Sequence, residues 1–220
     1  MPYTRVAQML RFLRAVLHDG GRAPEGGFRL ARRPSVPPEL VVAALGPRMQ
    51  RLAAAEADGV ALNFLSPDDV GRIRAENADV ERIVDAPLVV EARVFVVPGS
   101  DEAAEMAARR HVAAYLTVPV YTSFQRRLGR GPVLASLLEA WERGDRRAAV
   151  AAVPDRLIAD LFVTGSARAC ADGVRRYLDA GVDIATLALL PPHGRDFPAA
   201  AQVDFLCDLA RALGSAVSGR

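Results

Sequence analysis

The stretch that most restricts the possible folds of this chain is the continuous apolar run over residues 40–45, which follows Glu39. A run of this length without polar alternation is typical of a strand buried on both faces, as in a parallel sheet. Gly46-Pro47 ends the run, and residues 48–57 have the composition of a helix. A second run, apolar except for Asn63, follows over residues 60–65 and predicts a second buried strand. Two buried strands joined by a helix predict a parallel unit with a right-handed crossover.

The rest of the chain continues this alternation with one long interruption. Residues 88–97 predict a third strand and residues 184–190 a fourth, while residues 101–162 predict a helical insertion of short helices separated by glycines and a proline. Residues 199–213 predict a last amphipathic helix. We expect an α/β fold with about four parallel strands, half the number that closes a (β/α)₈ barrel. The expected domain is a single one over residues 1–213.

The amino-acid composition restricts the kinds of partner that the chain can bind. The 220 residues carry 28 basic and 26 acidic side chains, a net charge of +2, which gives no electrostatic support for nucleic-acid binding. All the basic residues are arginine, so chemistry that depends on a lysine is excluded. No apolar run approaches the roughly 18–20 residues of a membrane span, and no signal peptide is visible at the start. We expect a cytoplasmic protein without membrane or nucleic-acid partners.

Metal and disulfide chemistry find little support in the sequence. Cys170 and Cys207 are too few and too far apart for a disulfide framework or a zinc site, and both lie in predicted helices, which favours buried or half-buried thiols. No metal-ligand spacing, nucleophile elbow or catalytic triad is present. His111 in a predicted helix is more often a packing residue than a catalytic one. His193, in a loop after the fourth strand, is a candidate for a functional role.

The turn around Gly46 is the first candidate binding site. Gly46 allows another group to approach the backbone, and Pro47 sets the first helical dihedral angle. We expect the amides of Met49 and Gln50 to be free and to point beyond the carboxyl end of the strand. A helix N-terminus of this kind favours an anion such as a phosphate. The alternative stays open that the turn binds nothing, and there is no dinucleotide fingerprint.

Asn63 is the second candidate, because it is a polar residue near the carboxyl end of a predicted buried strand. A buried amide has to find hydrogen-bond partners. Asn63 therefore either braces a neighbouring loop or contacts a ligand, and the residues alone do not decide between the two.

The segment Leu40–Asn63 resembles the luciferase-like monooxygenase family, and within it the subgroup that uses the deazaflavin coenzyme F420. In that family a strand ending in Ala-Ala-x-Gly-Pro leads into a helix closed by Ala-Asp-Gly, and a strand follows. Residues 107–121 are similar to the family's helical insertion, and residues 165–183 to the helix before its last strand. The resemblance extends from residue 1 to about residue 192.

The resemblance implies a (β/α)₈-type barrel that binds F420, or alternatively FMN, at the carboxyl ends of its strands. This chain matches only the C-terminal part, family strands 5 to 8, so the fold implied is a partial (half) TIM-type barrel. Catalytic residues of the missing half have no counterpart here and stay unknown. The cofactor's phosphate is then expected at a turn and at the next strand end, formed by Ala43, Ala44, Leu45, Gly46, Pro47 and Asn63.

The activity implied is that of an F420- or flavin-dependent oxidoreductase or monooxygenase, which transfers hydride between its cofactor and a small organic substrate. The chain is expected to be truncated. The alternatives are a non-catalytic flavin- or F420-binding protein and an inactive C-terminal fragment. Because half a barrel exposes strand edges and apolar surface, we expect a homo-oligomer or a complementary N-terminal half to cover it.

Overall fold

The computed structural model describes residues 2–18, 27–32, 34–192 and 197–214. The chain divides into two compact units. Unit 1 consists of residues 1–62 and 73–91, and unit 2 of residues 63–72 and 92–220. Helix α3 and strand β3 each contribute residues to both units. The two units are described separately below.

Unit 1 begins with a helix and a parallel strand pair. Its elements are α1 (Pro2–Leu17), β1 (Val41–Ala43), α2 (Pro47–Glu56) and β2 (Gly59–Leu62), followed by the end of α3 (Pro67–Glu76) and the start of β3 (Val89–Pro98). Strands β1 and β2 are parallel, with Val41 opposite Gly59 and Ala43 opposite Ala61. In the sheet order, β2 is followed by β3. Strand, helix and strand thus follow one another as the sequence predicts.

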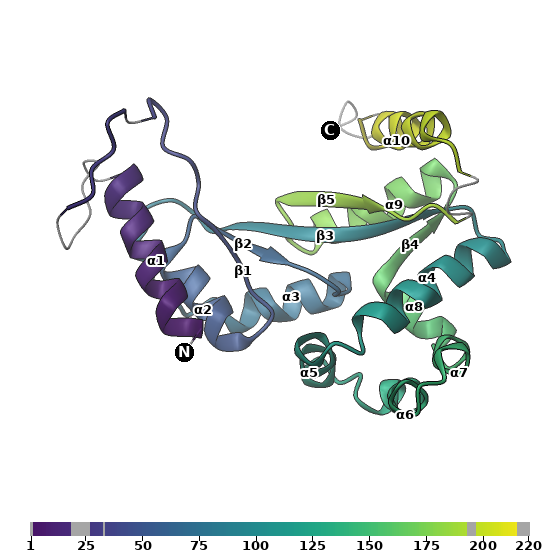
Figure 1. Ribbon diagram of the computed structural model, residues 1–220. Coiled ribbons are helices and arrows are strands. Elements are labelled where there is room, and N and C mark those ends of the chain that lie inside the picture. Colours follow the sequence, from purple (N-terminus) through teal and green to yellow (C-terminus); the bar gives the residue numbers. More distant parts are fainter. Residues whose placement is uncertain (1, 19–26, 33, 193–196, 215–220) are drawn as a thin grey trace. The chain divides into compact units, whose positions relative to one another are not determined.

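Unit 2 contains the helical insertion and the last two strands. Its helices are α4 (Glu102–Tyr115), α5 (Pro119–Arg127), the 3₁₀ turn η1 (Pro132–Leu134), α6 (Ala135–Glu142), α7 (Arg146–Ala151), α8 (Asp155–Leu161), α9 (Ala167–Asp179) and α10 (Ala199–Gly214). The strands are β4 (Phe162–Gly165) and β5 (Ile184–Leu189). Strand β4 runs parallel to β3 with Phe95 opposite Phe162, and β5 also pairs with β3. Helix α10 packs against α9 (Figure 1).

These elements confirm an α/β fold with a parallel sheet of the order β1-β2-β3-β4 and flanking helices, a partial TIM-type barrel. The helical insertion is also present. Strand β4 was not expected, because the helical insertion was predicted to continue to residue 162. The helix ends instead at Leu161, and Phe162 takes extended dihedral angles (φ −125°, ψ 148°) without any turn residue in between.

The core of unit 2 forms where the insertion packs on the sheet. Aromatic and aliphatic side chains of β3, β4, α4, α6 and α8 make one buried cluster. Burial of such side chains contributes about 1.5–3 kcal/mol each, which makes this cluster the main source of stability in the unit. Its largest members include Phe64, Phe95, Leu116, Leu137, Leu157 and Phe162.

Candidate functional site

The first candidate site is the turn between β1 and α2 in unit 1. The pairing of β1 with β2 extends to Ala44, whose amide donates to Ala61 (3.1 Å). Gly46 caps α2 with extended dihedral angles (φ −87°, ψ 149°), and Pro47 is the first helical residue. The buried side chain of Gln50 donates to the carbonyls of Ala44 (3.4 Å) and Leu45 (3.2 Å). A side chain of the helix therefore holds the turn in place.

The amides at this helix start differ from the expectation. Those of Met49 and Gln50 were expected to be free, and this was wrong, because both donate to the carbonyl of Gly46 at 3.0 Å. Gln50 is the fourth helical residue and so makes the first regular helical bond. Pro47 has no amide hydrogen. Among the described residues, no acceptor faces the amides of Gly46 and Arg48, so these two are the donors that the turn offers.

The surface beside Gly46 is open. Gly46, Pro47 and Arg48 are exposed, and a Cβ atom added at Gly46 would meet no other atom within 4 Å. The guanidinium of Arg48 lies over the ring of Tyr3, 4.8 Å from its centroid. Two free amides, the positive end of a helix dipole and an arginine on one exposed turn suit an anionic group such as a phosphate.

Asn63 lies directly after β2 and belongs to unit 2. Its Nδ2 atom donates to the hydroxyl of Tyr121 (3.2 Å), and its Oδ1 atom accepts from the amide of Phe64 (3.0 Å). Of the two alternatives that the sequence left open, bracing of a neighbouring segment is therefore observed. Contact with a ligand stays a prediction.

The segment after Asn63 is held in an unusual conformation. Phe64 has φ +54°, a left-handed value that non-glycine residues rarely adopt. Three buried side chains from different helices fix the backbone here. Gln125 donates to the carbonyl of Phe64 (2.6 Å), Tyr177 donates to that of Leu65 (2.9 Å), and Asp69 accepts from the amide of Ser66 (2.9 Å). Strained backbone held by its surroundings is common at functional sites.

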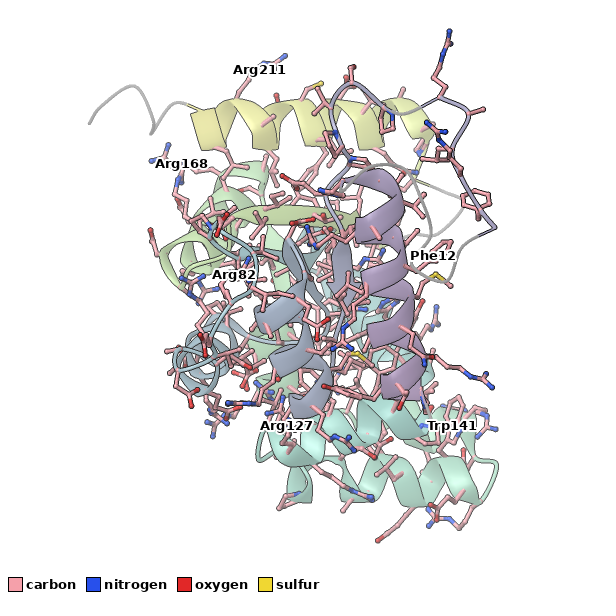
Figure 2. The ribbon with its side chains drawn as sticks, turned by 90° about the vertical axis from the view of Figure 1, so that its left-hand side faces the viewer. Phe12, Arg82, Arg127, Trp141, Arg168 and Arg211 are labelled. Carbon is pink, nitrogen blue, oxygen red and sulfur yellow. The ribbon has the colours of Figure 1, made fainter. Side chains whose placement is uncertain are left out.

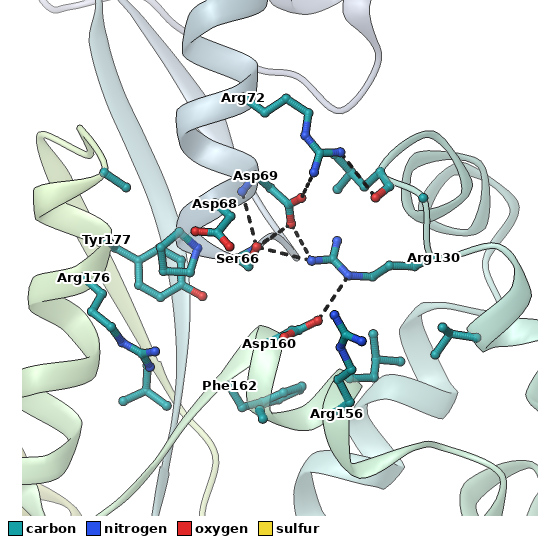
Figure 3. A pocket seen from close by; sticks show the side chains of 18 of the residues that line it. Ser66, Asp68, Asp69, Arg72, Arg130, Arg156, Asp160, Phe162, Arg176 and Tyr177 are labelled. Carbon is teal, nitrogen blue, oxygen red and sulfur yellow. Dashed lines mark hydrogen bonds and ion pairs between the residues drawn. The ribbon is translucent and has the colours of Figure 1, made fainter.

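Asp69 links this segment to a half-buried residue, Arg130. Its Oδ2 atom accepts from the hydroxyl of Ser66 (2.8 Å) and pairs with the guanidinium of Arg130 (2.7 Å), as Figure 3 shows. The network borders a cavity of about 700 Å³ in unit 2. Its lining carries four arginines and four aspartates: Arg72, Arg130, Arg156, Arg176, Asp68, Asp69, Asp160 and Asp179. The charges of these lining residues sum to zero, and Arg130 pairs with both Asp69 and Asp160.

Sequence reasoning missed most of these supporting residues. In the sequence, Ser66 and the two acids after it are typical of a helix cap, and their Ser-x-x-Asp spacing, that of a capping box, is the one local signal for the link between Ser66 and Asp69. Gln125, Arg130 and Tyr177 lie about 60 to 110 positions along the chain from the segment that they support. No periodicity or motif in the sequence predicts such long-range hydrogen bonds.

His111 lies in an aromatic cluster of unit 2. Its ring centroid is 4.6 Å from that of Tyr115, 4.7 Å from Phe95 and 5.6 Å from Phe64. The buried Nε2 atom has no hydrogen-bond partner. Burial, and secondarily the charge of Arg93, lowers the pKa of His111 below its ordinary value and favours the neutral imidazole. The packing role that the sequence favoured is thus observed.

The remaining candidates add no chemistry to the site. His193 lies outside the described residues. Cys170 is buried, as expected, whereas Cys207 is exposed on α10, which corrects the expectation of a half-buried thiol. Within the described ranges, no group of three or more His, Cys, Asp and Glu side chains is arranged to hold a metal ion. In the same ranges no helix is both long and apolar enough to cross a membrane.

Comparison with protein families gives a match to the model of the luciferase-like monooxygenases over residues 1–184. The chain belongs to the luciferase-like monooxygenase family. No curated protein matches the sequence. Family membership agrees with the partial TIM-type barrel and with the position of the β1–α2 turn at the carboxyl end of a parallel strand.

Solved structures of this fold include two F420-dependent proteins. An F420-dependent secondary alcohol dehydrogenase, solved with an F420-acetone adduct, matches with a TM-score of 0.65 and 12% identity over 96% of this chain and 62% of its own. The coenzyme F420-dependent tetrahydromethanopterin reductase from Methanopyrus kandleri matches with a TM-score of 0.60 and 22% identity over 84% of this chain and 55% of its own.

A third structure, apo-MsnO8, matches with a TM-score of 0.57 and 18% identity over 96% of this chain and 60% of its own. At these identities the similarity shows the shared fold. The luciferase-like chain described here spans less than two thirds of the length of each of these three structures.

Proposed function

We propose that this luciferase-like chain binds coenzyme F420, or FMN as the alternative, by its phosphate at the β1–α2 turn. In this proposal it takes part in hydride transfer between that cofactor and a small organic substrate. The observation that carries the proposal is the open, exposed turn at Gly46, with two unbonded amides at the start of a ten-residue helix. The family and the F420-dependent neighbours support this choice of cofactor.

The residues of the turn fit a phosphate. A glycine at position 46 leaves the space that a Cβ would occupy free for a phosphate oxygen. The amides of Gly46 and Arg48 donate to that oxygen and its neighbour, and Pro47 fixes the backbone between them. The side chain of Gln50 donates to the carbonyls of Ala44 and Leu45 and so fixes the backbone before Gly46. When bound, the cofactor supplies the hydride chemistry, and the turn orients it.

A ligand contact of Asn63, which belongs to unit 2, stays a separate prediction. Its Nδ2 atom carries two hydrogens, and the observed bond to Tyr121 uses one of them. The bonds to Tyr121 and Phe64 fix the rotamer of the carboxamide, so its second hydrogen is held in one direction.

The binding step is tested by titrating the purified chain with F420, FMN and riboflavin while ligand fluorescence is followed. Riboflavin has the ring system of FMN without the phosphate. We expect F420 or FMN to bind and riboflavin to bind at least tenfold more weakly, because the charged hydrogen bonds of the phosphate are lost. Equal affinities for FMN and riboflavin would contradict binding of the cofactor through its phosphate. No binding of F420 or FMN would contradict the cofactor proposal.

Turnover is a separate question, because the chain covers only part of its neighbours' length. We propose that a second polypeptide, either another copy of this chain or a complementary N-terminal half, completes the working enzyme. Light scattering during gel filtration measures whether the chain self-associates. Cofactor binding without hydride transfer, in the presence of the second polypeptide, would favour a non-catalytic cofactor-binding protein.

A further inference from the structure

The cavity of about 700 Å³ beside Asp69 lies wholly within unit 2. The start of α3, residues 128–133, α8, the start of β4 and the end of α9 form its walls. Part of the lining consists of buried apolar side chains: Leu128, Leu157, Phe162 and Val163. A cavity of this volume, with apolar walls and a few polar groups, is typical of sites for small organic molecules.

Arg130 places a fixed hydrogen-bond donor at this cavity. Its side chain is 12% exposed, unlike that of Arg211, which is 76% exposed and extends away from the ribbon in Figure 2. One terminal nitrogen of Arg130 donates to Asp69 (2.7 Å) and Ser66 (3.3 Å), and the other donates to Gln125 (3.2 Å). Because the guanidinium is planar, these bonds also fix the direction of its Nε–H group.

Asp160 places an acceptor next to this donor. Its Oδ2 atom lies 3.8 Å from Nε of Arg130, and Figure 3 shows the two side chains facing each other. This distance is too long for a hydrogen bond. Among the described residues, neither the Nε–H group nor the carboxylate has a hydrogen-bond partner. Both residues line the cavity, the side chain of Asp160 is 38% exposed, and Nε of Arg130 is not enclosed by protein atoms.

A donor and an acceptor side by side match a planar group that carries both functions on one edge. A lactam has its carbonyl oxygen and its N–H group on the same edge, so the carbonyl accepts from Arg130 while the N–H donates to Asp160. A charged ligand fits less well. An anion beside Arg130 also lies beside the carboxylate of Asp160, and a cation beside Asp160 also lies beside the guanidinium.

We propose that this cavity binds a small neutral molecule with a lactam edge, held by Arg130 and Asp160. Each of the two hydrogen bonds has a charged protein group on one side and is therefore stronger than a bond between neutral groups. The apolar part of the lining packs against the rest of the ligand. No residue of the Gly46 turn lines this cavity, so the inference does not rest on the cofactor proposal.

The test compares 2-quinolone with coumarin, using the full chain and isothermal titration calorimetry. The two bicyclic probes have nearly the same shape, but coumarin has a ring oxygen where 2-quinolone has the N–H of its lactam. We expect one 2-quinolone to bind per chain and coumarin to bind roughly 10- to 100-fold more weakly, because Asp160 then meets an acceptor. Equal affinities would overturn recognition by Arg130 and Asp160. Absence of saturable 2-quinolone binding would overturn the site.

Two aspartate variants on α8 test the acceptor. Asp160→Ala removes it but leaves the pairing of Arg130 with Asp69, so the two probes should bind with similar affinity. Asp155→Ala is the matched control, because Asp155 is an exposed aspartate of the same helix that does not line the cavity. It should keep the full difference between the probes. A difference that persists in Asp160→Ala would overturn the role of Asp160.

Two tryptophan variants test the location. Ala159 is exposed and lines the cavity, so Ala159→Trp should abolish saturable binding of 2-quinolone. Ala151→Trp places the same ring at an exposed position at the end of α7, outside the lining, and should leave binding unchanged. Unchanged 2-quinolone binding in Ala159→Trp would overturn the proposal even if Asp160→Ala fails to fold.

Discussion

The carboxamide of Gln125 donates a 2.6 Å hydrogen bond to the carbonyl of Phe64, the one non-glycine residue with a positive φ among those described. Gln125 is completely buried, and Phe64 is 1% exposed. Both partners of this hydrogen bond are therefore shielded from water. A side chain from α5 thus stabilises a strained conformation 61 positions earlier in the chain.

Gln125→Leu should therefore destabilise the chain by about 1–3 kcal/mol, because a buried carbonyl loses its donor. Urea unfolding followed by circular dichroism measures the change. Gln8→Leu is the control, since Gln8 is exposed on α1, and its effect should stay within about 0.5 kcal/mol. Equal effects of the two substitutions would show that the bond to Phe64 contributes nothing.

Close packing of α9 on β4 gives a second prediction. A Cβ atom at Gly173 would lie 2.5 Å from Cγ1 of Val163, too close for any side chain. Gly173→Ala should destabilise the chain by about 1–3 kcal/mol in spite of the better helix propensity of alanine.

Gly71→Ala is the matched control for this packing. Gly71 lies inside α3 and faces open space, so the same change should stabilise by roughly 0.5–1 kcal/mol. Thermal unfolding of the two variants should shift in opposite directions. A stabilising Gly173→Ala would contradict the described contact of α9 with β4.

The burial of His111 predicts that the stability of the folded chain depends on pH. Burial, with a smaller effect of Arg93, lowers its pKa, so the unfolded chain takes up its proton first as the pH falls below about 6.5. The contribution of neutral His111 to stability is complete above about pH 6.5. It is lost as the pH falls toward the lower pKa of His111 in the folded chain. The melting temperature should drop less between about pH 7.5 and about pH 5.5 in His111→Phe than in the natural chain. An unchanged drop in His111→Phe would rule out this origin.

The two cysteines should differ in reactivity. Burial raises the pKa of Cys170 to about 11, whereas Cys207 is exposed on α10. The thiolate is the reactive form, so iodoacetamide should modify Cys207 alone in the folded chain. Mass spectrometry should show one adduct, and none in Cys207→Ser until the chain is unfolded. Modification of Cys170 under native conditions would contradict its burial.

The fold could be predicted from the sequence where the signal was local. The apolar runs that became β1, β2, β3 and β5, and the glycines and prolines between the insertion helices, are patterns within about ten residues. Strand β4 was not predicted, because its four residues follow α8 directly without a turn signal. The second expected strand is shorter than predicted because Phe64 leaves the extended region.

The candidate site was predictable only in part. The Gly46-Pro47 pair identified the turn, but the free amides were assigned to the wrong residues because the helical bond of Gln50 to Gly46 was not counted. The support of the segment after Asn63 by Gln125, Tyr177 and Asp69 depends on contacts between distant parts of the chain. Such contacts follow from tertiary packing, which a single sequence does not display.

The most direct test of the cofactor site compares FMN binding to Arg48→Glu and Arg48→Gln. Arg48 is exposed in the first turn of α2, and both new residues are good helix formers, so both variants should fold. The two new side chains have nearly the same size and differ in charge. The account predicts that Arg48→Glu binds FMN at least tenfold more weakly than Arg48→Gln, because a carboxylate then lies beside the phosphate, and that the difference shrinks as salt is added. Equal affinity in the two variants would show that the phosphate does not lie at this turn.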